Sequence, residues 1–109
     1  MTRTLRYLLL LCFIGLSGVA FAQNGEISGR VLDEKKEPLI NATIQVFSGG
    51  IQKGGMVTDY DGNYSIKPLD AGNYDVLVLY QGYDSMMTTG VIVSPNKTTT
   101  VNFNMKKKT

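Results

Sequence analysis

The 109-residue sequence contains no histidine and no tryptophan, and Cys12 is its only cysteine. Without histidine, neither the common zinc ligand sets nor the Ser-His-Asp and Cys-His nucleophilic sites can be assembled. A single cysteine also excludes a disulfide within the chain. The composition therefore argues against an enzyme, and we expect no catalytic residue, no bound metal and no cofactor.

The first 22 residues have the pattern of an export signal. Arg3 and Arg6 precede an apolar run over residues 8–19, and Ala20 and Ala22 have the small-residue spacing that a signal peptidase reads. The run is shorter than the roughly 20 apolar residues that cross a bilayer. We predict a signal peptide over 1–22, export through the Sec pathway, and a mature domain over 23–109 that does not span the membrane. Its destination is the periplasm, the outer membrane or the exterior.

Removal of the signal also changes the charge balance. The whole chain has 11 Lys and Arg against 9 Asp and Glu, which gives a formal net charge of +2. Arg3 and Arg6 account for that excess, so residues 23–109 are close to neutral. A neutral domain has no electrostatic footprint for nucleic acid, and we interpret the three lysines at 106–108 as a solvated tail.

Short apolar runs with a period of two fill the rest of the chain, separated by Gly, Pro, Asn and Asp. No stretch has the period of an amphipathic helix. We expect seven strands, at residues 25–32, 41–47, 56–58, 63–66, 74–80, 85–93 and 98–105. This pattern predicts one all-β domain, a seven-stranded antiparallel Greek-key β-sandwich.

Residues 57–66 contain the clearest turn signal of the chain. Asp61-Gly62 predicts a tight turn that joins strands 56–58 and 63–66 as a hairpin. Asp59, Asp61 and Asn63 alternate like the first ligands of a calcium loop, but the glycine is misplaced and the terminal glutamate is missing, so we favour a turn. We interpret the glycine-rich stretch 48–55 as a flexible loop, and expect Pro68 to stop further sheet pairing.

Four segments, in this order and spacing, resemble the carboxypeptidase regulatory-like domain: Gly29–Asp33, Pro38–Val46, Thr58–Tyr64 and Gly72–Tyr83. The resemblance implies a transthyretin-like (prealbumin-like) sandwich and a non-catalytic module. Such domains stand at the N-termini of TonB-dependent outer-membrane transporters of Bacteroides-type bacteria. The transthyretin-like hydroxyisourate hydrolases rely on histidines, which this chain lacks.

Two pairs of residues are candidates for contact with a partner. Leu77 and Leu79 alternate with valines that we assign to the core, so they point outward and can form an apolar patch for another protein. Tyr60 at the turn and Tyr83 after Gly82 can form a platform on which a sugar ring stacks.

We therefore predict a non-catalytic, secreted accessory or protein-interaction module of the bacterial cell envelope, whose partner is an envelope protein of unknown identity. The first alternative is a carbohydrate-binding module with a glycan ligand. The second is a stand-alone or truncated N-terminal extension of a TonB-dependent transporter, since no plug or barrel follows within these residues.

Overall fold

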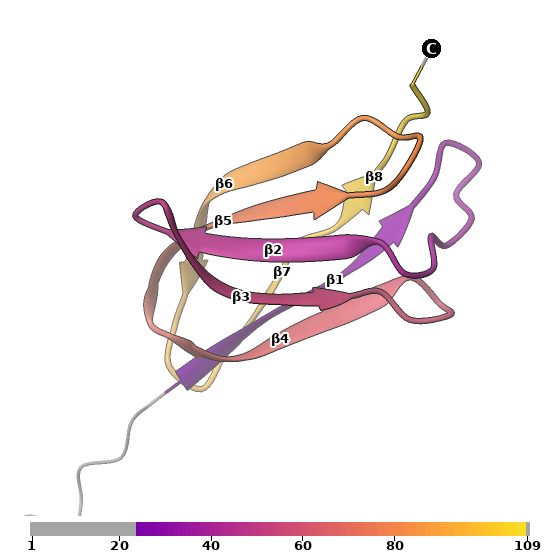
Figure 1. Cartoon of the computed structure of the whole chain (residues 1–109). Helices are drawn as coiled ribbons and strands as arrows, with labels where there is room; N and C mark the ends of the chain where they lie inside the picture. The colour runs from indigo at the N-terminus through magenta and orange to yellow at the C-terminus, as the bar shows by residue number, and fades with distance from the viewer. Residues whose placement is uncertain (1–23, 109) are drawn as a thin grey trace, which may run out of the picture.

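The computed structural model describes residues 24–108, which form eight strands in two sheets. One sheet contains β1 (Asn24–Leu32), β4 (Asn63–Asp70), β7 (Thr98–Thr100) and β8 (Phe103–Asn104). Its order is β4-β1-β7, and β8 also pairs with β1. The other sheet has the order β3-β2-β5-β6, with β2 (Thr43–Ser48), β3 (Ile51–Val57), β5 (Gly72–Leu79) and β6 (Met86–Val93). The two sheets form two layers (Figure 1), which confirms the predicted all-β sandwich.

Side chains that alternate along the strands fill the space between the sheets. On β5, Tyr74, Val76 and Val78 are buried, while the residues between them are not. The predicted inward sets on the other strands are also buried: Ile27 and Val31; Ala42, Ile44 and Val46; Val101, Phe103 and Met105. The period of two in the sequence thus identified the core face of four predicted strands correctly.

The last predicted strand, 98–105, is divided in the structure into β7 and β8, and both run parallel to β1. Between them, the side-chain oxygen of Asn102 accepts a hydrogen bond of 2.9 Å from the backbone N–H of Arg30. A side chain therefore replaces a backbone acceptor at this point, and the ladder is interrupted. The sandwich consequently has eight strands and two parallel pairs, where the sequence predicted seven antiparallel strands.

The predicted hairpin across Asp61-Gly62 is wrong, although the turn itself exists. Asp59 Oδ1 accepts hydrogen bonds of 2.9 Å from the backbone N–H groups of Asp61 and Asn63, and Gly62 has a φ of 75°. The strands on either side belong to different sheets, because β3 pairs with β2 and β4 pairs with β1. The turn connects the two layers of the sandwich.

The glycine-rich stretch is also not the loop that we expected. Residues 51–57 form β3, which pairs with β2 from Thr43↔Val57 to Ser48↔Ile51. Gly49 and Gly50, with φ of 59° and 78°, make the two-residue turn of this hairpin, the conformation for which glycine is favoured. The ladder bonds of β3 come from the backbone, so a lack of side chains does not prevent the strand from forming.

Pro68 does not end β4, contrary to the prediction. A bulge between Gly25 and Ile27 lets the pairing skip Lys67 and Pro68 and resume at Gly25↔Leu69 and Asn24↔Asp70. The proline is tolerated because it lies opposite the irregular part of the ladder, where no N–H group is needed.

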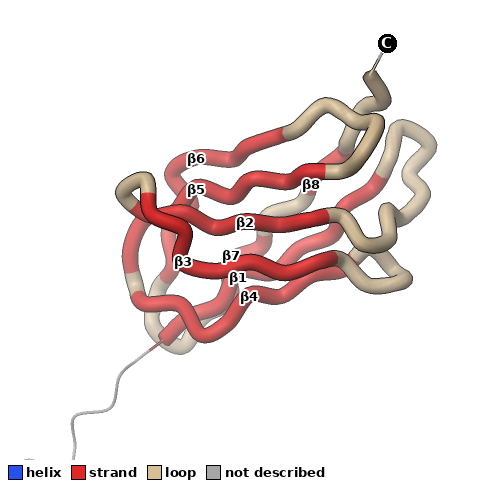
Figure 2. The backbone as a smooth tube through the Cα atoms, viewed as in Figure 1, coloured by secondary structure: helices blue, strands red, loops and turns tan. Residues whose placement is uncertain are grey.

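The loops at one end of the sandwich lie close together. The segments 33–42, 58–62 and 80–85 and the C-terminal residues all follow or precede strands at the end where β1 finishes, on the right of Figure 2. Chain positions that are far apart in sequence therefore meet at this end, which we call the loop end.

A tyrosine and a glycine join the strands of the β1 sheet. Tyr64 on β4 faces Gly29 on β1, and its buried hydroxyl donates a hydrogen bond of 2.5 Å to the carbonyl oxygen of Val101. A Cβ atom at Gly29 would overlap that carbonyl and lie 2.9 Å from Cε1 of Tyr64. The contact therefore requires glycine at position 29. Burial also raises the pKa of the Tyr64 hydroxyl, so it stays protonated and remains a donor.

Replacement of Gly29 is expected to disrupt the fold. Gly29→Ala should lower the free energy of unfolding by about 3 kcal/mol or more, because the backbone of Val101 must move. Tyr64→Phe should cost about 1–3 kcal/mol, the penalty for a buried carbonyl without its donor. Urea unfolding followed by circular dichroism measures both. Gly72→Ala is the control, since nothing lies within 4 Å of its Cβ position, and a large effect there with a small effect at Gly29 would contradict the assignment.

Glu26 lies on the outer face of the same sheet, among hydroxyl groups. Its carboxylate accepts hydrogen bonds from Ser65 and from Thr98 Oγ1. The bond from Ser65 is the main cause that lowers the pKa of Glu26 below 4.5, and partial desolvation opposes it; Lys67 and Thr98 lower the pKa further. The charged form of Glu26 is therefore preferred in the folded protein.

Stability should depend on pH through this group. A lowered folded-state pKa stabilises the protein above the unfolded-state value, and this contribution is lost as pH falls through the folded-state pKa. Glu26→Gln should therefore lower the thermal midpoint at neutral pH, and the difference from wild type should vanish in acid. Ser65→Ala should weaken the same pH dependence. A midpoint difference that is equal at neutral and acid pH would contradict this account.

Candidate functional site

The two outer faces of the sandwich differ in polarity. On the β1 sheet, the central outward residues of β1 are Glu26, Ser28 and Arg30, and their neighbours are Ser65 on β4 and Thr98 and Thr100 on β7. All of these side chains are polar or charged, as is usual for a solvated sheet face. This outer face needs no partner.

The outer face of the other sheet carries large apolar side chains. Leu77 and Leu79 point away from the buried Val76 and Val78, as the sequence predicted. Leu77 lies opposite Gln45 on β2 and Met87 on β6. Val57, Leu79, Met87 and Ile92 expose 50%, 37%, 51% and 64% of their surface. We call this surface, made by Phe47, Val57, Leu77, Leu79, Met87 and Ile92, the apolar outer face. Asp75, opposite Phe47, is the one charged residue among the cross-strand partners of this set.

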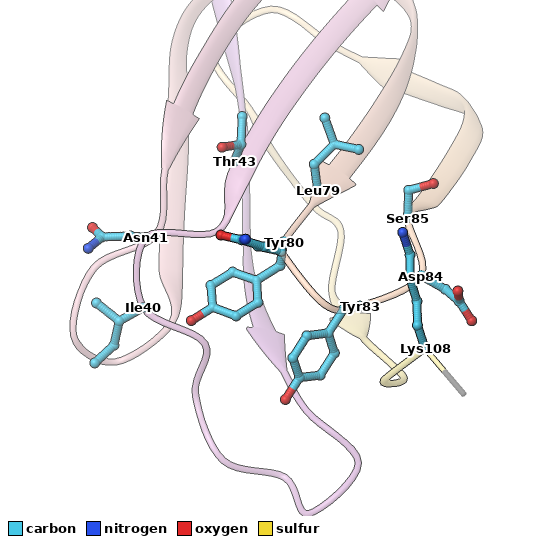
Figure 3. Close-up of a pocket in the computed structure, with 10 residues that line it drawn as sticks. Ile40, Asn41, Thr43, Leu79, Tyr80, Tyr83, Asp84, Ser85 and Lys108 are labelled. Atoms are coloured by element: carbon cyan, nitrogen blue, oxygen red, sulfur yellow. The ribbon is translucent and has the colours of Figure 1, made fainter.

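An open depression lies where the apolar outer face reaches the loop end. It has a volume of about 980 Å³ and is lined by residues from the 39–43 segment, the 79–85 segment and Lys108 (Figure 3). Leu79 belongs both to the apolar outer face and to this depression. The two candidate surfaces are therefore continuous.

Two tyrosines form part of the lining of the depression. The rings of Tyr80 and Tyr83 have centroids 5.3 Å apart and are inclined by 70°, an edge-to-face pair. A turn positions them, because the N–H of Tyr83 donates to the carbonyl of Tyr80 at 3.1 Å and Gly82 has a φ of 86°. Both rings are partly buried against the core. Figure 3 shows the two rings extending side by side from this turn.

Charged side chains of both signs lie around Tyr83: the carboxylates of Asp33, Glu34 and Glu37, and the lysines 35 and 107. Partial burial is the largest cause that raises the pKa of Tyr83, and Asp33 is the next, with smaller contributions from Tyr80, Glu34 and Glu37. The hydroxyl therefore stays neutral and can act as donor and acceptor.

Thr58 fixes the wall of the depression that contains residues 39–43. Its buried hydroxyl donates to the carbonyl of Leu39 at 2.5 Å and accepts from the N–H of Ala42 at 2.9 Å. Its backbone N–H and carbonyl bind Ala42 and Asn41. The sequence predictions did not assign this role to Thr58, and only its buried position after a strand signals it.

The backbone of the C-terminal lysines fixes the opposite wall, while the three lysines themselves are exposed, as expected. The carbonyl of Lys106 accepts from the N–H of Asp84, and the N–H of Lys108 donates to the carbonyl of Gly82. The N–H of Lys107 donates to Glu34 Oε1 at 2.9 Å. Backbone atoms make these contacts, which composition and charge do not reveal.

The predicted pairing of Tyr60 with Tyr83 is not present. Tyr60 lies on the 58–62 turn and exposes 84% of its surface, but it does not line the depression. The structure places Tyr80 beside Tyr83 instead, and both rings pack against the core. The spacing of three residues around Gln81-Gly82 is the signal that could have identified this pair, since such a turn brings its ends together.

Ala20 and Ala22 of the predicted cleavage site lie outside the described residues.

The side chains of this site are suited to binding. Within residues 24–108, no group of three or more His, Cys, Asp or Glu side chains is arranged to hold a metal ion. In the same part of the chain, no helix is long and apolar enough to cross a membrane. The depression offers aromatic rings, hydroxyls, amides, one carboxylate and one lysine, the groups with which proteins orient a ligand.

Comparison with solved structures identifies several similar folds. The minor pilin GBS52 of Streptococcus agalactiae matches with a TM-score of 0.61 and 19% identity over 81% of this chain and 46% of the pilin. A putative carbohydrate binding protein of Bacteroides uniformis matches with 0.61 and 18% over 76% of this chain and 41% of that protein. The 5-hydroxyisourate hydrolase of Klebsiella pneumoniae matches with 0.61 and 16% over 78% and 92%.

At these identities the likeness concerns the fold alone. This chain spans less than half the length of the pilin and of the carbohydrate binding protein. The match to the hydrolase confirms the transthyretin-like architecture. The comparison with curated proteins finds no match for this chain.

A family model gives the more specific result. The model of the carboxypeptidase regulatory-like domain matches residues 26–106, which includes nearly all of the described residues. The matched region contains both sheets, the apolar outer face and the depression. This chain belongs to the carboxypeptidase regulatory-like domain family.

Proposed function

We propose that this chain is a non-catalytic interaction module of the bacterial cell envelope. It is exported through the Sec pathway, which removes the signal peptide after Ala22, and it acts in the periplasm, at the outer membrane or outside the cell. It binds an envelope protein through the apolar outer face of the β3-β2-β5-β6 sheet. The family resemblance further suggests that the domain is a stand-alone or truncated N-terminal extension of a TonB-dependent transporter.

The contrast between the two outer faces is the observation that carries this proposal. Both sheets share one core, but only the outer face of the β3-β2-β5-β6 sheet carries several exposed large apolar side chains, interspersed with polar residues such as Thr43 and Gln45. Exposed apolar patches with polar surroundings mark interaction sites. Transfer of such surface out of water yields about 25 cal/mol per Å². A partner that covers Leu77, Met87 and their neighbours would therefore gain free energy, whereas the opposite sheet offers little to bury.

The arrangement of the sheet suits a flat, apolar docking partner. Leu77 lies on β5, an inner strand of the sheet. Its neighbour Met87 on β6 is apolar, and its neighbour Gln45 on β2 is polar. Asp75 adds a single charge beside Phe47. The family is regulatory-like and non-catalytic, and the pilin and the carbohydrate binding protein both contain a region of similar fold within longer chains.

A lysine at the centre of the apolar outer face tests the proposal. In Leu77→Lys, the partner would have to cover a charged group, so recovery of cross-linked envelope partners should fall about tenfold or more. Thr100→Lys places the same charge on the exposed outer face of the β1 sheet and is the matched control. Quantitative mass spectrometry after cross-linking in intact cells measures both.

Thermal unfolding of the two variants completes the experiment. Leu77 points away from the core, so both variants should retain the wild-type midpoint within a few degrees. Equal recovery of partners with Leu77→Lys and Thr100→Lys would contradict docking through this face. Unfolding of Leu77→Lys would also count against it, because Leu77 would then be a structural residue.

A further inference from the structure

We propose that the depression at Tyr80 and Tyr83 binds a neutral oligosaccharide, a second function that is separate from protein docking. The inference rests on the hydroxyl groups of the tyrosines, on the polar rim and on the rigid walls. Its volume of about 980 Å³ is at the upper end of the range of small-molecule sites, about 300–1,000 Å³.

The hydroxyl groups distinguish these two tyrosines from those of the core. Tyr64 and Tyr74 donate to the backbone carbonyls of Val101 and Asp70. Within residues 24–108, the hydroxyls of Tyr80 and Tyr83 make no such bond, and both rings lie beside the depression. A ring that only closed the end of the core would not need a hydroxyl. A sugar uses both parts of a tyrosine, because its C–H face stacks on the ring and its hydroxyls bind the phenol.

The rim supplies further polar groups that are not used internally. Asn41, Gln81 and Asp84 line the depression, and all three are exposed. Their side chains form no hydrogen bond with other described residues of the chain. Amides donate and accept, and a carboxylate accepts from two neighbouring hydroxyls, which matches the alternating groups along the edge of a sugar ring. Figure 3 shows Asn41 and Asp84 on opposite sides of the two tyrosines.

The lining carries charges of both signs. Asp84 contributes a carboxylate and Lys108 an ammonium group, so the formal charges of the lining cancel. Such a site has no net charge with which to attract an anionic or a cationic ligand. A neutral oligosaccharide can use both groups as hydrogen-bond partners.

The walls are held in place before a ligand arrives. Thr58 binds the 39–42 segment, and the backbone of Lys106 and Lys108 binds the 82–84 segment. A fixed site loses little entropy on binding, which favours a small polar ligand over a long flexible one. An apolar peptide fits less well, because Ile40 and Leu79 are the main aliphatic side chains of the lining.

Isothermal titration of the purified protein with neutral hexasaccharides tests the proposal. The probes are linear β-glucan, xylan, mannan and galactan fragments, with an oligogalacturonate as the anionic comparison. At least one neutral probe should bind with a Kd in the millimolar range or tighter. Because the chain has no tryptophan, tyrosine fluorescence provides an independent signal.

Variants locate the site. Tyr83→Ala should weaken binding about tenfold or more, the loss expected for a stacking ring, while Tyr83→Phe should lose less. Tyr60→Ala, at an exposed tyrosine outside the depression, is the control and should leave the Kd within about twofold. The double variant Gln81→Ala/Asp84→Ala changes exposed rim residues only, so it separates weaker binding from loss of folding.

Three results would overturn the proposal: no neutral probe binds at millimolar concentration, Tyr60→Ala removes binding while Tyr83→Ala does not, or an apolar peptide binds the depression in place of every sugar. The failure of this proposal is distinguishable from failure of the docking proposal. Leu77→Lys should leave sugar binding intact, and Gln81→Ala/Asp84→Ala should leave the cross-linked partners unchanged.

Discussion

The bond from the Tyr64 hydroxyl to the Val101 carbonyl, made across Gly29, is the constraint on which the rest of the sandwich depends. It joins β4, β1 and the segment between β7 and β8, and therefore fixes the closing strands against the first strand. Val101 also donates its N–H to Ser28, so both of its backbone groups are bound. No disulfide within the chain can hold these strands together, because Cys12 is the only cysteine. Close packing at a glycine takes the place of a covalent link.

The sequence predicted the features that depend on local alternation, and failed where distant backbone atoms decide the structure. The buried faces of β1, β2 and β5 followed from their period of two, since each strand has one face in the core. The partner of β3 did not follow, because Gly54 and Gly55 carry no side chains that indicate a face. The turn at Asp61-Gly62 has the residues of a hairpin and yet connects two sheets, and no local signal separates the two cases. The position of Pro68 depended on a bulge in β1, far away in sequence.

In the candidate site, too, local alternation could be predicted from the sequence and contacts between distant backbone atoms could not. The outward direction of Leu77 and Leu79 followed from alternation with buried valines. The depression did not, because its walls are held by Thr58 and by the backbone of the C-terminal lysines, which composition describes only as polar and charged. Leu79 connects the two surfaces, so a protein partner on the outer face and a sugar at the loop end would lie next to each other. Such an arrangement would let one small domain hold an envelope protein close to a glycan.

The central claim is that the apolar outer face is covered by a partner in the cell. Methionine oxidation followed by mass spectrometry tests it directly, because exposed thioethers are oxidised and covered ones are protected. Met87 lies on this face and exposes 51% of its surface, whereas Met56, with 41%, contacts the backbone of Ser65 and serves as the internal reference. We predict that the ratio of Met87 to Met56 oxidation is several-fold lower in intact envelopes than in the purified protein. An equal ratio in the two samples would contradict the claim.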